Sequence, residues 1–549
     1  ATRLADVVRT HGPQSVGVLV GPWSTNEEAY YAQKLAREVI GTESVDSTVG
    51  PFAATTNAAL AGAFGVYKLP ADLTDVATAS TIVVIASDLE SSNNIVALRV
   101  KDAVVRNDAR LIVISSRYGE VCDYIAPPPS GTIMPTPQRV RSAAPTGVWL
   151  RPTPGGETAT VAALGRALAN ALAYNGEGAG AVLDGPDAAP GIEDADLQQA
   201  VAVLQAAATG EGKLAVIYAA GRTQPSLAAE ATKAAANLAI LCRGEQAATS
   251  LYVLPPESNT HGLIDMGVRP GNGGQTLQSM LDGGVRALLV VGDNPVMHLP
   301  DQQRVTEALE RLDCLVVVDA LQTDTARLAH VALADRGDYG KDGTYTNADF
   351  RLLRLARAEA AIGDQRDCLE LLSDLGTQIG ARLGRSVSLP VPEAAAVTAE
   401  IAATVPGYAG AARSFESGSL RVLTDAPSRA ALQPVSLPVL PATNGHLLLT
   451  TSRTLYTSLE GASIRSPEAD KLHREEFIEL NPSDAAALGI GQNRPVAVSA
   501  NGEELTLSAA LTDAVAPGSV FLPLYYEGGI VNRLIAAHES LPLVTVRPI

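Results

Sequence analysis

Residues Ser15–Gly41 read SVGVLVGPWSTNEEAYYAQKLAREVIG and contain the clearest structural signals in the chain. The stretch opens with the apolar run Ser15–Val20, which is typical of a strand buried on both faces. Thr25 and Glu28 have the spacing of a capping box, in which each side chain satisfies a backbone N–H at a helix start. Apolar side chains then recur every three to four residues, and Gly41 is a favourable helix stop. The stretch therefore predicts a strand, a tight turn and an amphipathic helix.

The same strand–turn–helix pattern recurs along the chain. Apolar strands that alternate with amphipathic helices are typical of parallel sheets covered by helices on both faces. We therefore predict an α/β fold with Rossmann-like parallel-sheet domains. No GxGxxG sequence follows the first strand of a unit, so a standard NAD site is not indicated. The predicted strands are Thr81–Ile85, Leu111–Ile114, Leu214–Tyr218, Ala287–Val291 and Leu315–Asp319, and the predicted helices span 92–107, 225–241 and 302–312.

The sequence pattern changes towards the C-terminus, where short strands predominate. Asn501-Gly502 is a strong signal for a two-residue type I′ hairpin turn. A short helix over 483–488 ends at Gly489. We expect this part to form a small β-barrel. Its predicted strands are His446–Thr451, Phe477–Leu480, Pro495–Ala500, Glu504–Leu511 and Val520–Leu524.

These patterns predict a division into domains. At 549 residues, the length gives a prior of about three or four domains. The Pro-rich segment 126–145 is expected to be an extended surface crossing. The predicted parts are an α/β domain formed by 1–50 and 180–385, an inserted Rossmann-like α/β domain at 51–179, a linker at 386–440, and a C-terminal β-barrel domain at 441–549.

Composition and charge argue against several functions. The formal net charge is −18, which disfavours nucleic acid and anionic lipid as partners because like charges repel. No apolar run approaches the roughly 18 residues that cross a bilayer, and no secretory signal pattern is visible, so we expect a cytoplasmic location. The seven histidines form no metal-ligand pair, and Cys122, Cys242, Cys314 and Cys368 form no CxxC motif. We therefore assign no metal site to these residues.

Polar side chains follow several predicted strands. In open α/β sheets, ligands bind outside the carboxyl ends of the strands. Asp, Asn and Thr at such positions can hydrogen-bond a ribose or a guanine edge, and glycine lets a ligand approach the backbone. The alternative is that these are ordinary turn and cap residues. The candidate loops are Gly21–Asn26, Ser115–Arg117, Gly292–Pro295, Asp319 with Thr323 and Thr325, and the glycine-rich Asp335–Asn347.

Several segments, taken together, resemble the large-subunit molybdopterin oxidoreductase family. The resemblance spans essentially the whole chain, with the segments in the family's order. It implies Rossmann-like domains followed by a dinucleotide-binding barrel domain. The segments are TNEEAYYAQKLAREVIGTESVDS (Thr25–Ser47), VVGDNPVMHLPD (Val290–Asp301), VVVDALQTDTARLAHVAL (Val316–Leu333), GDYGKDGTYTNADFR (Gly337–Arg351) and the C-terminal stretch Phe477–Tyr526.

The chain also departs from that family. The resemblance implies that a metal-ligating Cys, selenocysteine or Ser would lie just after Thr42–Asp46. Here the stretch Asp46–Phe52 reads DSTVGPF, so only the hydroxyl groups of Ser47 and Thr48 could ligate a metal through oxygen. Basic residues that would meet pterin phosphates are sparse.

Loss of the ligand with retention of the fold resembles the complex I branch of the family. There, the C-terminal part of the G-type subunit of NADH–quinone oxidoreductase acts as a scaffold. The resemblance implies a non-catalytic part of the peripheral arm, with no catalytic residue, metal or cofactor in this chain. Iron–sulfur clusters would lie on a missing N-terminal part or on partner subunits. Its partners would be other subunits of the arm, at the cytoplasmic face of the inner membrane, with no nucleic acid and no direct membrane insertion.

The alternative is a molybdenum or tungsten bis-pterin oxidoreductase chain, similar to formate dehydrogenase, that lacks its iron–sulfur domain. In that case the resemblance assigns pterin contacts to residues of the candidate loops. In a scaffold the same residues would form a vestigial pterin pocket. These candidates are Gly292, Asn294, Asp319, Thr323, Gly343 and Asn347.

Overall fold

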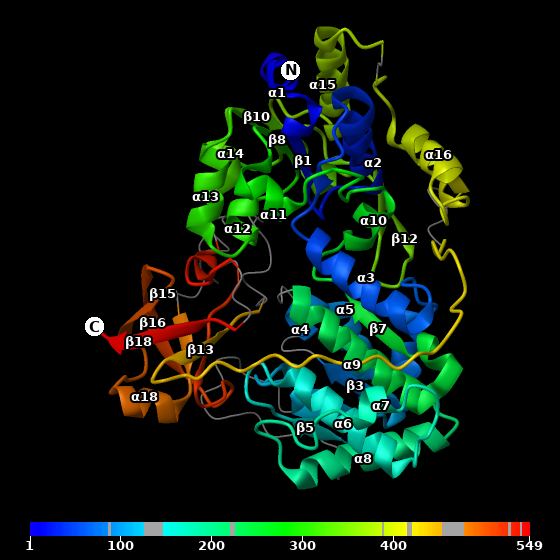
Figure 1. The fold of residues 1–549 in the computed structure, drawn as a ribbon, viewed down its shortest axis with the longest axis vertical. Coiled ribbons are helices and arrows are strands. Elements are labelled where there is room, and N and C mark those ends of the chain that lie inside the picture. Colours follow the sequence, from blue (N-terminus) through cyan, green and yellow to red (C-terminus); the bar gives the residue numbers. More distant parts are fainter. Residues whose placement is uncertain are drawn as a thin grey trace. The chain divides into compact units, whose positions relative to one another are not determined.

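The computed structural model describes residues 1–85, 89–125, 147–219, 225–386, 389–413, 420–452, 477–524, 529–537 and 541–549. The chain forms two compact units, each assembled from two segments of sequence (Figure 1). Unit 1 comprises Ala1–Ala53 and Glu257–Thr424, and unit 2 comprises Ala54–Pro256 and Asp425–Ile549.

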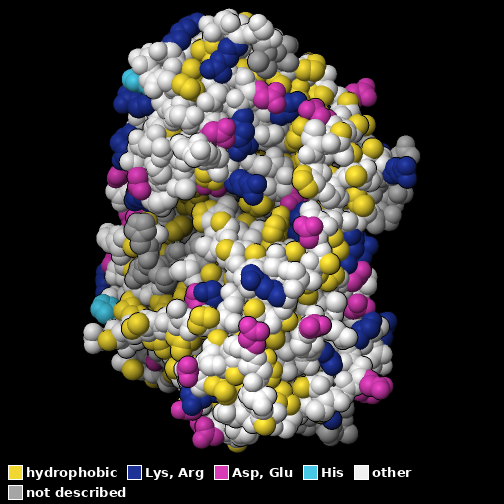
Figure 2. Space-filling view, turned by 45° about the vertical axis from the view of Figure 1, so that its right-hand side comes forward, with side chains coloured by type: hydrophobic (Ala, Val, Ile, Leu, Met, Phe, Trp, Pro, Cys, Tyr) yellow, Lys and Arg dark blue, Asp and Glu magenta, His cyan; other side chains and the backbone are white. Residues whose placement is uncertain are grey.

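The surface carries charges of both signs. On the face drawn in Figure 2, Lys and Arg side chains are interspersed with Asp and Glu side chains. That face therefore does not form one continuous acidic surface, although the net charge of the chain is −18. Among the helices within the described ranges, none is both long enough and apolar enough to cross a membrane.

Unit 2 contains a five-stranded parallel sheet in the order β5-β4-β3-β6-β7. Its strands are β3 (Thr81–Ile85), β4 (Arg110–Ile114), β5 (Val148–Leu150), β6 (Leu214–Ala219) and β7 (Leu251–Leu254). The helices that accompany it in sequence are α3 (Gly50–Phe64), which begins in the segment of unit 1, α4 (Leu89–Ser92), α5 (Asn94–Asn107), α6 (Glu157–Ala171), α7 (Gly180–Leu183), α8 (Asp194–Thr209) and α9 (Pro225–Arg243).

Strands β6 and β7 differ from the predicted domain division. We expected residues 180–385 to share a domain with 1–50. Instead β6 pairs with β3, and β7 pairs with β6, so both belong to the sheet of unit 2. Local periodicity identifies a strand but does not say which sheet it joins, because that choice depends on packing against distant neighbours.

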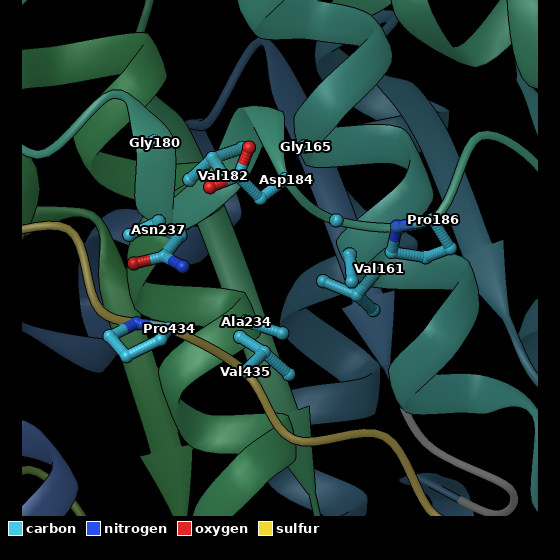
Figure 3. A pocket seen from close by; sticks show the side chains of 13 residues that line it. Val161, Gly165, Gly180, Val182, Asp184, Pro186, Ala234, Asn237, Pro434 and Val435 are labelled. Carbon is cyan, nitrogen blue, oxygen red and sulfur yellow. The ribbon is translucent and has the colours of Figure 1, made fainter.

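Unit 2 also has a cavity of about 360 Å³ between α6, α7, α9 and the segment Pro434–Val435 (Figure 3). Its walls are mostly small or apolar, as at Gly165 and Val182. The Asn237 side chain lies at the cavity but is already engaged, because its Nδ2 donates to the Gln433 carbonyl at 2.7 Å and its Oδ1 accepts from the Gln433 N–H at 2.8 Å. Asp184 is the only charged residue among the described residues that line the cavity, so the lining does not gather the several convergent polar groups of a typical ligand pocket.

The C-terminal segment of unit 2 closes into a six-stranded barrel, as predicted. Asn501 and Gly502 join β15 to β16 with φ of 51° and 77°, both in the left-handed region that a type I′ turn requires. The short helix α18 (Pro482–Leu488) ends at Gly489. The barrel order is β13 (Leu447–Thr450), β17 (Ser519–Phe521), β14 (Phe477–Leu480), β16 (Glu503–Leu511), β15 (Pro495–Ala500) and β18 (Leu543–Pro548).

The segment predicted as the linker 386–440 contains more structure than expected. Helix α16 (Ala394–Thr404) lies within it, and Arg421 forms an isolated bridge with Arg351 in unit 1. The weak helical periodicity of this Ala-rich helix concealed it from the sequence analysis. The predicted crossing at 126–145 lies outside the described residues.

Arg117 joins the sheet of unit 2 to the barrel. Its guanidinium forms a two-pronged pair with the Glu479 carboxylate, at 3.0 and 2.9 Å, and lies 3.9 Å from the centroid of the Phe521 ring. The exposed fractions of the two charged side chains are 16% and 7%. The predicted candidate loop Ser115–Arg117 therefore has a docking role within unit 2.

We expect Arg117→Ala to lower the free energy of unfolding of unit 2 by roughly 3 kcal/mol, because it leaves Glu479 as a buried carboxylate without its cation. Chemical denaturation followed by hydrogen exchange in β14 measures this. Arg547→Ala is the matched control, since it removes a similar Arg–Glu pair with exposed fractions of 55% and 49%, and such exposed pairs contribute about 1 kcal/mol or less. Equal losses in the two variants would contradict the docking role.

Unit 1 contains a second five-stranded parallel sheet, in the order β10-β9-β8-β1-β2. From β1 the chain proceeds first to one side of the sheet and later to the other, so the direction of winding reverses between β1 and β8. In such sheets this reversal marks the crevice where ligands bind. The strands are β1 (Val16–Val20), β2 (Val45–Asp46), β8 (Ala287–Val291), β9 (Cys314–Asp319) and β10 (Val331–Ala334).

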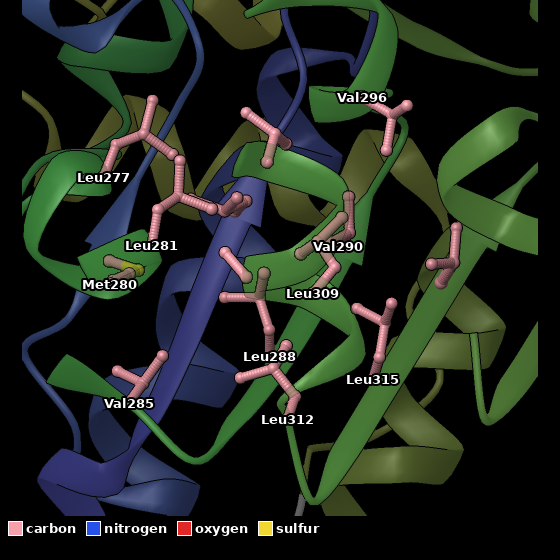
Figure 4. Close-up of a cluster of buried hydrophobic side chains, with 14 of the residues drawn as sticks. Leu277, Met280, Leu281, Val285, Leu288, Val290, Val296, Leu309, Leu312 and Leu315 are labelled. Atoms are coloured by element: carbon pink, nitrogen blue, oxygen red, sulfur yellow. The ribbon is translucent and has the colours of Figure 1, made fainter. Parts of the chain in front are cut away.

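One face of this sheet packs on an aliphatic core (Figure 4). Leu288, Val290 and Leu315 project from β8 and β9 towards Leu281 and Leu309 of the covering helices, and all are at most 6% exposed. The core is aliphatic because aromatic residues make up only 4% of the chain. The helical segments on this side are α11 (Leu277–Ser279), a π-type turn (Met280–Gly284), α12 (Pro295–His298), α13 (Gln302–Glu310) and α14 (Asp324–Leu328).

Helix α2 (Asn26–Lys34) follows β1 and begins as predicted. The Thr25 hydroxyl accepts from the Glu28 N–H at 3.1 Å, and the Glu28 carboxylate accepts from the Thr25 N–H at 2.9 Å. The helix continues through a π-type turn (Leu35–Ile40) to Gly41, whose φ is 85°. The remaining elements of unit 1 are α1 (Thr2–His11), α10 (Thr260–Asp265), α15 (Cys368–Leu383), α16, and the hairpin of β11 (Gly343–Thr346) and β12 (Leu352–Leu355).

Candidate functional site

The candidate site is the carboxyl edge of the unit 1 sheet. The loops after β1 and β8 meet there without side chains between them: a Cβ built on Gly21 would lie 1.7 Å from the Gly292 carbonyl oxygen. Gly292 itself has a φ of 58°. These two glycines let the backbones of the two loops touch at the point where the winding reverses. The side-chain atom nearest to a Cβ built on Gly292 would be the Ser24 hydroxyl, at 3.0 Å.

Asp293 ties three parts of this edge together. Its Oδ1 lies 2.8 Å from Nδ1 of His298, and its Oδ2 accepts from the Thr48 hydroxyl at 2.9 Å. Asp293 and His298 are 1% and 4% exposed. The His298 ring packs against the indole of Trp23, with centroids 4.9 Å apart. The loop after β1, the loop after β8 and the stretch after β2 are thus connected through the buried Asp293 and His298 side chains.

Asn294 and Thr323 serve the local fold. The Asn294 Oδ1 accepts from the Thr325 hydroxyl at 2.6 Å and from the Thr325 N–H at 3.1 Å. The Thr323 hydroxyl accepts from the Ala326 N–H at 3.0 Å as the N-cap of α14. The structure therefore brings these predicted candidates to the ends of β8 and β9, and each also has the cap or turn role that we set out as the alternative.

Asp319 is the acidic candidate that offers most to a ligand. Its Oδ1 accepts from the Leu321 N–H at 2.9 Å, and no side chain in the described ranges donates to it. Burial raises the pKa of this carboxyl group to about 6, while the Leu321 N–H and the nearby Lys341 ammonium oppose that rise and Asp293 adds to it. A carboxylate with spare accepting capacity at the end of β9 suits the N–H edge of a heterocyclic base.

Gly343 and Asn347 lie in the β11–β12 hairpin. A Cβ built on Gly343 would lie 2.8 Å from atoms of Thr25 and Glu27, so glycine allows β11 to pack against the start of α2. The Asn347 Oδ1 accepts from the Arg351 N–H at 2.7 Å and from the Asp349 N–H, which forms the hairpin turn. Both candidates support the hairpin, and their predicted ligand contacts remain predictions.

A buried ionic cluster behind this hairpin escaped the sequence analysis. The Lys341 ammonium lies 3.1 Å from Glu28 Oε1 and 2.7 Å from Asp335 Oδ2, and all three residues are at most 6% exposed. Burial raises the pKa of Glu28 to about 7 against the opposing pull of Lys341, and it also raises the pKa of Asp335. Glu28 was recognisable only as a cap, since its ionic partners are distant in sequence.

Cys368 borders this cluster. Glu28, Asp335 and Cys368 can place one ligand atom each within 4.8 Å of one another. The Lys341 ammonium already supplies a cation to both carboxylates. Burial raises the pKa of the Cys368 thiol well above its usual range, so the thiolate that a metal needs is disfavoured. The cluster is best explained as an ionic clamp between α2 and the segment 335–341.

Glu27 forms a second buried connection. Its carboxylate accepts from the Thr344 N–H at 2.7 Å and from the hydroxyls of Thr344 and Thr398 at 2.8 and 2.7 Å. Burial raises its pKa, and these hydrogen bonds oppose the rise. The adjacent acidic residues at the start of α2 thus hold β11, α16 and the 335–341 segment in place.

The stretch after β2, where a metal ligand was sought, is engaged within unit 1. Asp46 accepts from the Leu277 N–H at 2.7 Å and the Ser47 N–H at 2.8 Å, and burial raises its pKa to about 6. Ser47 is fully buried, and the Thr48 hydroxyl donates to Asp293. The stretch offers hydroxyl groups and no thiol, so its donors do not suit a metal that is held by a thiolate or selenolate.

Comparison with protein families gives two matches. The model described as "Molybdopterin oxidoreductase" matches residues 1–378, and the model described as "Molydopterin dinucleotide binding domain" matches residues 447–543. Together they cover the α/β parts and the barrel.

Similar curated proteins carry several functions. The alpha subunit of NADPH-Fe(3+) oxidoreductase from Geobacter sulfurreducens is 28% identical over 100% of this chain and 65% of its own length. The alpha subunit of F420-dependent formate dehydrogenase from Methanocaldococcus jannaschii is 24% identical over 97% of this chain and 84% of its own. A G-type subunit of NADH-quinone oxidoreductase from Rhizobium meliloti is 26% identical over 97% and 62%. The chain thus spans about two thirds of the length of the Geobacter relative.

Among solved structures, acetylene hydratase from Pelobacter acetylenicus has the same fold. The TM-score is 0.74 at 14% sequence identity, and the match covers 100% of this chain and 88% of that chain. This likeness supports the predicted architecture of parallel sheets with a C-terminal barrel, and at this identity it carries no information on activity.

Proposed function

Because the chain belongs to the molybdopterin oxidoreductase family, we propose that it binds a molybdopterin dinucleotide as part of an oxidoreductase. This is the alternative of our two expectations, and it is now the better supported one. The dinucleotide-binding match at 447–543 and the relatives named as formate dehydrogenase and NADPH-Fe(3+) oxidoreductase subunits favour it. The match also argues against our expectation that the chain carries no cofactor. The complex I protein is one relative among several.

The observation that carries the proposal is Asp319 at the carboxyl end of β9. Its carboxylate receives no side-chain donor from the described residues, and the carbonyl of the preceding Val318 accepts from the Gly292 N–H at 2.8 Å. A guanine edge presents adjacent N–H donors that a carboxylate can accept together. When bound, such a cofactor supplies the redox chemistry, and the chain supplies its binding and orientation.

The stretch of this chain that would supply the metal ligand fits the cofactor less well than the candidate nucleotide site does. A ligand from the 46–52 stretch would be an oxygen of Ser47 or Thr48, and Thr48 would first have to release Asp293. We therefore assign no catalytic step to these residues. The proposal concerns binding of the dinucleotide and membership of a multi-subunit oxidoreductase, since the relatives named above are subunits.

Analysis of the natively purified protein tests the proposal. We expect acid treatment to release the nucleotide of the dinucleotide form, accompanied by molybdenum or tungsten at roughly one per chain, because the cofactor carries the metal. Nucleotide and metal content per chain are measured by chromatography and elemental mass spectrometry.

The second candidate function is a scaffold in an assembly of the complex I type. It is favoured by the hydrogen bond from the Thr48 hydroxyl to Asp293, because this bond engages a hydroxyl group that could otherwise ligate a metal. Abundant iron in the purified assembly, with no molybdenum, no tungsten and no released nucleotide, would favour the scaffold and overturn the cofactor proposal.

A further inference from the structure

The loop after β1 presents a tryptophan on a firmly held backbone. The Pro22 carbonyl accepts from the Asn259 N–H at 3.2 Å, and the Ser24 carbonyl accepts from the Asn259 side chain at 2.9 Å. The Trp23 carbonyl accepts from the Tyr345 hydroxyl at 2.8 Å. Three successive carbonyls are thus anchored, so the Trp23 indole projects from a backbone with little freedom to rearrange. Such pre-organisation lowers the entropic cost of binding.

The Trp23 indole packs against a buried side chain on one side, and part of it is exposed. The buried His298 ring packs against it with centroids 4.9 Å apart and an interplanar angle of 41°. The Asp293 carboxylate contacts that ring and accepts in turn from the Thr48 hydroxyl. Trp23 nevertheless remains partly exposed. Within the described ranges its indole N–H has no hydrogen-bond acceptor. A supported aromatic face with a free N–H is well suited to stacking on a flat ligand.

Trp23 and Asp319 lie at or just beyond the ends of strands that are two apart in the sheet of unit 1. Trp23 follows β1 and Asp319 ends β9, with β8 between them, so two strand spacings of about 4.8 Å separate their strands. Gly292, above β8, carries no side chain into this interval. The Ser24 hydroxyl is 1% exposed and has no partner among the described residues. The edge thus carries an aromatic side chain and a carboxylate with spare accepting capacity, two strands apart, on either side of the Gly292 loop.

The accepting group of the site is the Asp319 carboxylate. Glu27, Glu28 and Asp293 lie nearby in sequence or at the same edge, but their carboxylates are engaged by hydroxyl, ammonium and imidazole partners. The Asp319 carboxylate receives no side-chain donor from the described residues, so it can accept from a ring with N–H donors.

We propose that Trp23 is the stacking wall for a planar 2-amino-4-oxopyrimidine ring whose N–H edge faces Asp319. This inference rests on the proposed function and deepens it by naming a residue that binds the ring. Guanine and pterin share this edge, so the cofactor offers two sources of the same chemistry, and the experiment must separate them.

The test uses full-length protein from a host that cannot make molybdopterin, titrated with GDP and, separately, with neopterin. Trp23 and Trp149 are the chain's two tryptophans. We expect ligand binding to quench fluorescence in wild type and in the matched control Trp149→Phe, and the quenching to be lost in Trp23→Phe. Calorimetry should give GDP binding roughly tenfold to hundredfold weaker in Trp23→Ala, as stacking on an aromatic side chain generally contributes that much. Trp23→Phe retains a ring and should stay close to wild type in affinity.

The outcomes separate the two proposals. Tighter binding of GDP assigns the ring to guanine, and tighter binding of neopterin assigns it to the pterin. IDP lacks the 2-amino group and should bind more weakly than GDP, a comparison that needs no variant. Equal GDP and neopterin affinities in wild type and Trp23→Ala, or no binding of either ligand to wild type, would overturn the inference. The proposed function fails instead if natively purified protein releases no nucleotide, which is measured independently of Trp23.

Discussion

Replacing Lys341 with Met is expected to lower the free energy of unfolding of unit 1 by about 3–5 kcal/mol. The variant keeps the length of the side chain and removes the only cation that contacts Glu28 and Asp335 among the described residues. Two buried carboxyl groups would then face each other without compensation. Because multi-unit proteins seldom unfold in one step, we would measure the loss by hydrogen exchange of α2 and β11 amides in increasing urea.

Lys213→Met is the matched control for Lys341→Met. Lys213 pairs with Asp75 at the surface, where the exposed fractions are 55% and 46%, and its loss should change the stability of its unit by less than about 1 kcal/mol. A Lys341→Met variant whose α2 amides exchange as slowly as in wild type would refute the clamp.

The effect of Lys341→Met should depend on pH in a definite direction. The pKa of Glu28 is raised to about 7 by burial, so the folded state holds this proton more tightly than the unfolded chain, where the usual value is 4.5. The contribution of Glu28 protonation to stability is therefore full below about pH 4.5 and is lost as the pH rises through 7. At pH 5 the Glu28 and Asp335 carboxyl groups of the variant can stay protonated and uncharged. At pH 8 each must either ionise without a cation beside it or stay protonated at a cost in free energy. We expect the destabilisation to be larger at pH 8.

Asp319→Ala is expected to reduce the dinucleotide content of natively produced protein at least tenfold. A hydrogen bond to a charged acceptor contributes about 1.5–3 kcal/mol, and an N–H edge facing an apolar methyl group would lose two such acceptors. Released nucleotide per chain is the measurement. Asp313→Ala is the matched control, because Asp313 stands just before the opposite end of the same strand and is paired with Arg286 at the surface.

The pH dependence of Asp319 gives this prediction a second readout. Its pKa is raised to about 6, so protonation stabilises the cofactor-free fold below pH 3.8 and this contribution is lost as the pH rises through 6. Ligand N–H donors need the ionised form, so nucleotide retention should instead increase between pH 5 and 7. Asp319→Asn should remove that increase. Full retention in Asp319→Ala would show that this edge does not hold the dinucleotide.

Prediction from sequence succeeded where a few neighbouring residues decide the conformation. The capping box of Thr25 and Glu28, the stop at Gly41 and the Asn501-Gly502 turn all formed as predicted. Each depends on backbone hydrogen bonds or on φ preferences within about four residues. The same locality explains why the ends of strands such as β3 and β15 were found correctly.

Prediction failed where the answer depends on residues far apart in sequence. The pairing of β6 with β3 could not be read from either strand, because both are uniformly apolar runs that fit any buried parallel sheet. The ionic clamp was hidden for the same reason, since Glu28 and Lys341 are 313 residues apart. A lysine in a polar glycine-rich segment resembles a solvated residue until the packing buries it.

Most helices and strands, their order, and the acidic and glycine-rich character of the loops at the strand ends follow from the sequence alone. Local periodicity, caps and turns suffice for that because they act within one element. The folded chain was needed to show that Trp23, Gly292 and Asp319 lie at the ends of three consecutive strands of one sheet, and that the Thr48 hydroxyl donates to Asp293. Burial makes the difference, because it changes the protonation, the partners and the free hydrogen-bonding capacity of side chains whose identities were known from the start.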